Sequence, residues 1–191
     1  MNTNATKQQL LEKLYEPYKA CMLCPLALQG RTQVVFGHGN PNAKLMLIGE
    51  APGKEEDENG LPFVGRSGKL LTATLNALAI KRNDLFITNI VKCRPPNNRA
   101  PLSNEIAICK KILLEKQIKI IQPKVICTLG ACATFALIEH TASISKIRGQ
   151  EFNYQGSLLI PTFHPAYILR NQKILPLLAQ DLEKAFKKIG T

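Results

Sequence analysis

Three polar segments follow strand-like runs of this sequence, and their side chains are of types that can bind a ligand and do chemistry on it. Glu50 and Ala51 follow the apolar run that ends at Ile48, Asn89 closes the next run, and His164 follows the last one. The carboxyl ends of parallel strands open into one crevice, where ligands of α/β proteins bind. Singly, each side chain could be a loop cap, a turn histidine or a solvated acid. Their shared placement predicts a site.

The six cysteines divide into two groups. Cys127 lies in an apolar run and Cys132 in the helix expected after it, so we expect both to be small core residues. Four others could hold a zinc ion or an iron–sulfur cluster, namely Cys21, Cys24, Cys93 and Cys109. Their spacing does not choose between these groups, and four scattered buried thiols are the alternative. Structural disulfides are not expected in a cytosolic chain.

The acidic run at residues 55–58 is expected to be a solvated turn. Such a run could attract Mg²⁺ and indicate a nuclease, but no acid lies near Asn89 or His164 in the sequence to complete a two-metal site. Gly65-Arg66-Ser67-Gly68-Lys69-Leu70 lacks the spacing of a phosphate loop, and Gly37-His38-Gly39 lacks the third glycine of a dinucleotide motif. No nucleotide cofactor is expected.

The elements that position these residues alternate between strand and helix, which predicts an α/β fold with a parallel sheet covered on both faces. The expected strands are 44–48, 85–90, 125–129 and 158–162, with 152–154 as an antiparallel partner of the last. The expected helices are 8–20, 67–78, 103–121, 131–138 and 172–188, with loops at 21–42 and between the first strand and Ser67. Ser67 and Ser103 are expected to be N-caps, with Glu105 near the positive end of its helix.

Length and charge narrow the class of protein. The 191 residues, 45% of them hydrophobic, predict one domain spanning 1–191. The polar N-terminus and the lack of a long apolar run predict a soluble, cytoplasmic protein with no membrane partner. With 25 Lys and Arg against 14 Asp and Glu, the formal charge is +11, which suits a polyanionic partner or serves solubility alone. The low aromatic content of 6% argues against a broad base-stacking surface.

Six motifs occur in order along most of the chain. They are Cys21-x-x-Cys24-Pro25-Leu26, Arg31-Thr32-Gln33-Val34-Val35-Phe36-Gly37, Gly49-Glu50-Ala51-Pro52-Gly53, Gly60-x-Pro62-Phe63-Val64-Gly65-Arg66-Ser67-Gly68-x-Leu70-Leu71, Thr88-Asn89-x-Val91-Lys92-Cys93-Arg94-Pro95-Pro96 and Pro161-Thr162-x-His164-Pro165-Ala166. Together they resemble family 4 uracil-DNA glycosylases, the iron–sulfur branch of that superfamily. The resemblance implies a three-layer α/β/α sandwich with a four-stranded parallel central sheet. It also implies a monomeric DNA repair enzyme that hydrolyses the N-glycosidic bond of uracil in DNA and leaves an abasic site.

The resemblance assigns roles around the flipped base. Phe63 would stack on uracil, Asn89 would read its polar edge, His164 would donate to O2, and Gly49 and Gly53 would belong to the uracil site. Ala51 stands where a better-known branch has a water-activating Asp, so we expect a dissociative reaction. Glu50 would position water or exclude thymine. A structural 4Fe-4S cluster would be held by Cys21, Cys24, Cys93 and Cys109.

Contacts to DNA are implied for a further set of residues. The residues expected to contact the DNA backbone are Arg66, Ser67, Lys92, Arg94, Arg99 and Arg170. Ile168 or Leu169 would fill the space that the base leaves in the duplex. The alternative for these two is ordinary packing at the start of a helix. Two alternatives remain. A covalent uracil-DNA binder of the same superfamily is disfavoured because 94–102 is short and contains no His. An inactive iron–sulfur DNA-binding module, such as a polymerase-associated domain, is disfavoured because Phe63, Asn89 and His164 occur together.

Overall fold

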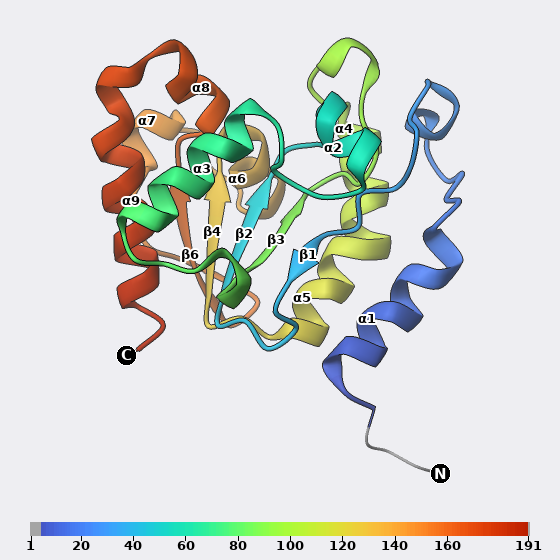
Figure 1. Cartoon of the computed structure of the whole chain (residues 1–191), viewed down its shortest axis with the longest axis horizontal. Helices are drawn as coiled ribbons and strands as arrows, with labels where there is room; N and C mark the ends of the chain where they lie inside the picture. Colours follow the sequence, from blue (N-terminus) through green and yellow to red (C-terminus); the bar gives the residue numbers. More distant parts are fainter. Residues whose placement is uncertain (1–4, 191) are drawn as a thin grey trace.

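The computed structural model describes residues 5–190, and the centre of its fold is a sheet whose four central strands are parallel and end at the same edge (Figure 1). The strands are β1 (His38–Gly39), β2 (Leu45–Gly49), β3 (Phe86–Asn89), β4 (Val125–Leu129), β5 (Phe152–Tyr154) and β6 (Ser157–Thr162). Their order is β1-β3-β2-β4-β6-β5, and β1 and β5 add antiparallel edges to four parallel central strands. The expected parallel centre and the antiparallel 152–154 partner are confirmed, whereas the short β1 was not expected.

Helices cover both faces of this sheet. They are α1 (Lys7–Tyr15), η1 (Glu16–Tyr18), η2 (Pro25–Leu28), α2 (Lys54–Asn59), α3 (Arg66–Ala77), η3 (Arg82–Asp84), η4 (Pro96–Asn98), α4 (Ser103–Cys109), η5 (Lys110–Leu114), α5 (Glu115–Ile121), α6 (Ala131–Leu137), α7 (Ile144–Ile147), α8 (Pro165–Arg170), η6 (Gln172–Ile174) and α9 (Leu175–Lys187). Among residues 5–190, no helix is both long and apolar enough to cross a membrane.

The alternation of side chains along the strands builds two cores. Leu45 and Leu47 of β2 pack with helices α3 and α9, while Met46 and Ile48 face the opposite cluster, which contains residues of α1, α5 and α6. Successive strand residues point to opposite faces, so a strand that is apolar throughout needs a helical layer on each side. The three-layer α/β/α architecture is therefore confirmed.

Some expected helix limits were wrong. Gly65 and Leu102, rather than Ser67 and Ser103, are the N-caps of α3 and α4, so each serine lies inside its helix. The Glu105 carboxylate nevertheless accepts a hydrogen bond from the backbone N–H of Leu102, as an acid near a helix start should. A 3₁₀ turn, η1, follows α1 at Glu16, and Pro17 lies within it.

The helix expected at 103–121 is continuous but not uniform. Between α4 and α5 the chain forms a π-helical turn, η5, directly after Cys109. A π turn holds more residues than an α turn, and such turns are frequent at functional sites. Here the turn separates the cysteine-bearing α4 from α5, whose buried residues pack on the sheet.

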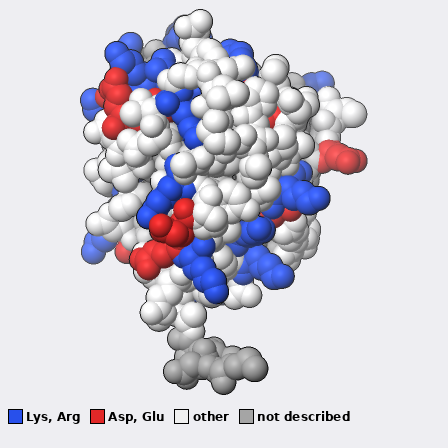
Figure 2. All heavy atoms as spheres, turned by 90° about the vertical axis from the view of Figure 1, so that its right-hand side faces the viewer, with Lys and Arg blue, Asp and Glu red and all other residues white. Residues whose placement is uncertain are grey.

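The surplus of basic residues is spread in patches. Figure 2 shows the face on the right of Figure 1, where Lys and Arg side chains form several separate groups with wide uncharged areas between them. A polyanion would therefore meet local basic contacts rather than one continuous basic surface on this side.

Candidate active site

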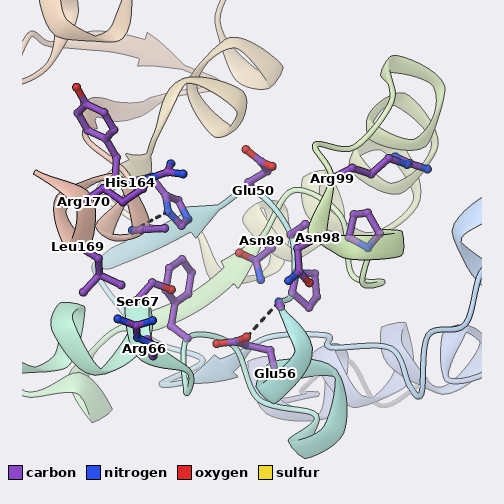
Figure 3. Close-up of a pocket in the computed structure, with 17 residues that line it drawn as sticks. Glu50, Glu56, Arg66, Ser67, Asn89, Asn98, Arg99, His164, Leu169 and Arg170 are labelled. Atoms are coloured by element: carbon purple, nitrogen blue, oxygen red, sulfur yellow. Dashed lines mark hydrogen bonds between the residues drawn. The ribbon is translucent and has the colours of Figure 1, made fainter.

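A cavity of about 610 Å³ opens at the carboxyl ends of the central strands. Figure 3 shows Asn89 in the middle of it, with Arg66, Ser67, Leu169 and Arg170 on one side and Asn98 and Arg99 on the other. Residues expected from the sequence supply most of the lining, namely Glu50, Ala51, Gly53, Phe63, Arg66, Ser67, Asn89, Arg99, His164, Leu169 and Arg170. The expected meeting of three distant segments at one site is confirmed.

Asn89 lies at the floor with its amide oxygen unpaired. The residue is 1% exposed, and its Oδ1 is the one buried side-chain oxygen or nitrogen without a hydrogen-bond partner in the described part of the chain. A buried acceptor without a donor costs about 1 to 3 kcal/mol. Such an atom at the floor of a cavity indicates a ligand that brings a donor.

Gly49 makes this arrangement possible. It pairs with Asn89 across β2 and β3, and a Cβ at Gly49 would lie 2.5 Å from Asn89 Oδ1 and would overlap the Phe63 ring. Only a residue without a side chain lets the amide and the ring approach the same stretch of backbone. Gly49 thus shapes the site without lining it, while Gly53 lines it directly.

Phe63 is held in an uncommon backbone conformation. Its φ is +54°, in the left-handed region, and its ring is only 5% exposed. Gly68 of α3 permits this, because a Cβ there would clash with the carbonyl group of Phe63. Arg82 holds the same loop by donating to the Pro62 carbonyl oxygen at 2.5 Å and to Thr72 Oγ1 at 3.1 Å. The aromatic wall of the cavity is therefore fixed from two sides.

Glu56 ties together the two loops that form the site. Its Oε2 accepts from the N–H of Gly53 at 3.1 Å, and its Oε1 accepts from those of Val64 at 3.0 Å and Gly65 at 2.8 Å. At 7% exposure, the carboxylate is buried. The solvated turn expected at 55–58 is wrong for Glu56 and for Asp57, which is 1% exposed and accepts from Thr32 N at 2.8 Å. Both acids lie in the helical segment α2, and their carboxylates accept hydrogen bonds from backbone N–H groups of neighbouring loops.

His164 is a neutral hydrogen-bond donor. It is the N-cap of α8, and its Nδ1 accepts from the backbone N–H of Ala166 at 3.1 Å. The proton of the neutral ring must then be on Nε2. Burial lowers the pKa of His164 to about 4, against which the charge of Glu56 acts weakly in the opposite direction. At neutral pH the ring can therefore donate through Nε2 without carrying charge.

In Figure 3, Glu50 lies on the other side of Asn89 from Glu56, and it has an unexpected partner. Burial raises the pKa of Glu50, and a hydrogen bond with the Cys132 thiol partly offsets this rise. Burial and the charge of Glu50 raise the pKa of Cys132 to about 12. Cys127 is the core residue that was expected, at 0% exposure, but Cys132 is half-buried and contacts the site.

Two of the expected DNA contacts are wrong because the side chains are buried. Lys92 is 0% exposed, with its ammonium group inside the protein, and burial lowers its pKa to about 7. Ile168 is 1% exposed and packs in the core beside α3 and α9, which is the helix-start alternative. Leu169, by contrast, lines the cavity.

The arginines near the cavity differ in how much of their hydrogen-bonding capacity is used. Arg66 and Arg170 are exposed and line the cavity. Arg99 also lines it, but its guanidinium is paired with the buried carboxylate of Glu105 at 2.7 Å. Arg94 lies outside the lining and donates from Nε to Asn98 Oδ1 at 2.9 Å. Arg66 and Arg170 are therefore the most available for an anion.

The four cysteines singled out by the sequence meet at one end of the core. Cys93 and Cys109 are buried in the cluster against which Cys21 and Cys24 pack. Burial raises the pKa of Cys93 and that of Cys109, the latter to about 12, and the charge of Cys24 contributes to both shifts. Across residues 5–190, no group of three or more His, Cys, Asp or Glu side chains has the arrangement of a metal-ion site.

Arg31 joins the cysteine-bearing segments. Its Nη1 lies 2.8 Å from Cys93 Sγ and its Nη2 donates to the Cys21 carbonyl oxygen at 2.5 Å. A cation that contacts a thiol favours the thiolate form, which is the form that binds metals. All six cysteines are free. The donor set suits an iron–sulfur group by its chemistry.

Sequence reasoning missed several residues of the site. Glu56, Asn98, Pro95 and Tyr167 line the cavity, and Cys132 contacts Glu50. Of these, only Glu56 gave a signal, since it lies three residues after Gly53 at the start of a helix, the place of a capping acid. Cys132 and Tyr167 lie in the helices α6 and α8, and Pro95 and Asn98 in the segment after β3, and no spacing in the sequence revealed that they meet at the site.

Comparison with known proteins agrees with this geometry. Residues 36–189 match the family model of the uracil DNA glycosylase superfamily. The chain belongs to this superfamily, in its type-4 branch. The type-4 uracil-DNA glycosylase of Thermotoga maritima is 47% identical over 184 residues, which cover 94% of this chain and 95% of the relative. Those of Sulfurisphaera tokodaii and Saccharolobus solfataricus are 45% and 43% identical, over 94% and 95% of this chain and 83% and 87% of their own lengths.

Proposed function

We propose that this uracil-DNA glycosylase superfamily member removes uracil from DNA by hydrolysing its N-glycosidic bond, which leaves an abasic site. The unpartnered Oδ1 of Asn89 carries this proposal, since it lies in one cavity with the Phe63 ring and the His164 imidazole. A base must leave the helical stack to reach such a buried atom. The type-4 relatives are named for this activity.

Asn89 selects uracil by its hydrogen-bonding pattern. The unpaired Oδ1 accepts the N3–H of uracil, while the amide N–H₂ donates to O4. Cytosine presents the reverse pattern, so a buried cytosine leaves polar groups unpaired at a cost of about 1 to 3 kcal/mol each. The ring of Phe63 stacks on the base and holds it at this depth.

His164 stabilises the departing base. Negative charge builds on uracil O2 as the glycosidic bond breaks, and the Nε2–H of the neutral ring donates to that oxygen. One donor of this kind contributes about a hundredfold to a thousandfold in rate. The Ala166 N–H fixes the required tautomer through Nδ1.

Water enters after the bond has begun to break. Ala51 offers no base at the cavity wall, so the sugar cation forms first and a water molecule then attacks it. Glu50 holds that water or blocks a methylated base, and the raised pKa of its carboxyl group favours the protonated form more than in an exposed acid. A carboxylic acid can both donate and accept for a water molecule.

Contacts to the DNA strand surround the cavity. Arg66, Ser67 and Arg170 contact phosphates near the flipped base, with Arg94 and Arg99 farther along the strand. Leu169 fills the space left in the duplex, as apolar side chains do at unstacked steps.

The cysteines Cys21, Cys24, Cys93 and Cys109 would hold a 4Fe-4S cluster with a structural role. Cysteine thiolates are the usual ligands of iron–sulfur clusters, and four of them would complete such a ligand set here. The group would join the N-terminal loop to the segment that follows β3. We further propose a monomer in the cytoplasm, where free thiols persist.

The purified protein tests this proposal directly. We expect a brown solution with absorbance near about 400 nm, and abasic sites in a uracil-containing oligonucleotide without added Mg²⁺. A colourless zinc protein would remove the cluster from the proposal. Strand cutting that EDTA abolishes would indicate the nuclease, and a stable protein–DNA adduct would indicate the covalent binder.

A further inference from the structure

The buried side chain of Lys92 makes a complete set of hydrogen bonds beneath the cavity. Its Nζ donates to Thr88 Oγ1 at 2.6 Å, to the Asn89 carbonyl oxygen at 2.7 Å and to Gln117 Oε1 at 2.7 Å. An ammonium group has three N–H bonds, so each one has an acceptor. A buried ammonium group is tolerated inside a protein only when its N–H bonds are paired in this way.

The directions of these bonds are fixed by a second layer. Thr88 Oγ1 donates its own proton to the Phe36 carbonyl oxygen at 2.9 Å, and Gln117 Nε2 donates to the same oxygen at 2.8 Å. Thr88 Oγ1 and Gln117 Oε1 are therefore left as acceptors toward Lys92. We call Lys92, Thr88, Gln117 and Phe36 the lysine network.

The two oxygen atoms of Asn89 differ in their hydrogen bonding. Its carbonyl oxygen is bonded to Lys92, while its amide Oδ1 has no partner. The residue is the last of β3, and Lys92 folds back to this strand end from the segment that leads to Cys93. The main chain of Asn89 is thus held firmly, and its side chain is left for a ligand.

We propose that Lys92 is a positioning residue for base recognition, which holds the Asn89 peptide so that the amide meets the polar edge of the flipped base. This inference rests on the proposed function. A misplacement of about 1 Å in a reacting or recognising group can slow a reaction by about a hundredfold. No contact between Lys92 and DNA is involved, since the side chain is 0% exposed.

A double-mutant cycle tests this role. Lys92→Met keeps an unbranched side chain of similar length but has no donor, and Asn89→Ala removes the amide through which Lys92 acts. We expect Lys92→Met to slow single-turnover uracil excision by about 30-fold to 100-fold in the wild-type background. In the Asn89→Ala background it should change the rate by less than about threefold, because residues that act through one another are not additive.

Three controls separate positioning from a general loss of structure. Arg148→Met breaks the buried pair of Arg148 with Asp181, which shares no residue with the lysine network, and should lower the melting temperature while excision below that temperature stays unchanged. Visible absorbance must be retained in Lys92→Met, so that a lost cluster is not mistaken for a misplaced amide. Free uracil should raise the melting temperature of the wild type more than that of Lys92→Met.

Thr88→Val provides a second route if Lys92→Met does not fold. It removes one acceptor of Lys92 with little change of shape and should slow excision by about threefold to tenfold, again only when Asn89 is present. A wild-type rate in the folded Lys92→Met variant, or an equal slowing in both Asn89 backgrounds, would overturn the inference. A wild-type protein that leaves uracil in place would instead overturn the proposed function.

Discussion

The Phe63 ring and the His164 imidazole lie 5.8 Å apart between their centroids and are tilted by 36°. Phe63 comes from the loop between α2 and α3, and His164 from the start of α8. A base stacked on Phe63 therefore brings its edge to the imidazole. Because binding and catalysis share neighbouring walls of one cavity, measurements of affinity and of rate are needed to separate them.

Removal of the imidazole should affect the rate far more than binding. We expect His164→Ala to slow single-turnover excision by about a hundredfold or more, with DNA affinity within about threefold of the wild type. In the proposed mechanism, His164 donates to charge that develops only as the bond breaks. Rapid-quench measurement of abasic sites, together with fluorescence anisotropy for binding, checks this. An unchanged excision rate would remove His164 from the mechanism.

The depressed pKa of His164 predicts how stability depends on pH. The folded protein keeps the ring neutral down to about pH 4, whereas the unfolded chain takes up a proton near pH 6.5. As the pH falls from 6.5 to 4, the unfolded chain binds more protons than the folded one, so stability is lost over this window. His164→Gln should lose less stability across it, and thermal melts of both proteins in matched buffers measure the difference.

The same pKa predicts the pH profile of excision. If the neutral imidazole is the donor, the rate should stay level as the pH falls from 7 to about 5.5. Below about pH 5 a protonated Nδ1 would oppose the Ala166 N–H, and the rate should fall. A rate that halves near pH 6.5 would contradict the assignment of the donor as a neutral ring.

Gly49→Ala should damage recognition and stability together. The added Cβ would lie 2.5 Å from Asn89 Oδ1 and would overlap the Phe63 ring, so both groups must move. We expect excision to fall by about a hundredfold and stability by about 1 to 3 kcal/mol. In a Phe63→Ala background the same change should cost less stability, because the clash with the ring is gone. Equal costs in both backgrounds would argue against this clash.

Glu56→Gln tests the acid that joins the two loops. A glutamine can keep its oxygen toward Val64 and Gly65 but then turns its NH₂ toward the N–H of Gly53, so two donors face each other. We expect a loss of about 1 to 3 kcal/mol in stability and slower excision. Glu55→Gln is the matched control, since that exposed side chain makes only a surface pair with Lys69. Similar results for the two variants would contradict the role of Glu56.

Arg170→Ala should weaken DNA binding without regard to sequence. The exposed guanidinium at the edge of the cavity is proposed to contact a phosphate, so its loss should reduce the slope of log K against log salt by about 1. Lys81→Ala, at an exposed residue outside the cavity lining, is the control. A salt slope equal to that of the wild type would mean that Arg170 makes no phosphate contact.

Much of the fold follows from local pattern. A continuous apolar run placed β4 at 125–129, and the turn at Gly156 and Ser157 placed β5 at 152–154, both with their observed limits. The polar residues at the strand ends placed Asn89 and His164 in one site. These features depend on periodicity and on the geometry of parallel strands, which neighbouring residues determine. The short helix α2 was missed because its charged sequence shows no apolar face.

The wrong assignments share a physical cause. Lys92 was expected to contact phosphates because of the family resemblance, yet it is buried and its acceptors include Gln117, a residue 25 positions away in the sequence. Ile168 or Leu169 was expected to enter DNA because their segment resembles an inserting loop, but Ile168 is buried in the core and Leu169 lines the cavity. Burial of a single side chain depends on partners that meet only in the folded chain, so a motif alone does not reveal it.

The π-helical turn η5 fixes how many residues separate Cys109 from the buried residues of α5. Cys109 ends α4 just before the turn, whereas Gln117 in α5, after the turn, contacts Lys92 and the Phe36 carbonyl oxygen. Deleting one residue from 110–114 would rotate everything that follows by about 100° relative to Cys109. The continuous helical segment could then no longer place both Cys109 and the buried residues of α5 correctly. Insertions and deletions at this turn should therefore be tolerated as poorly as replacement of a cysteine.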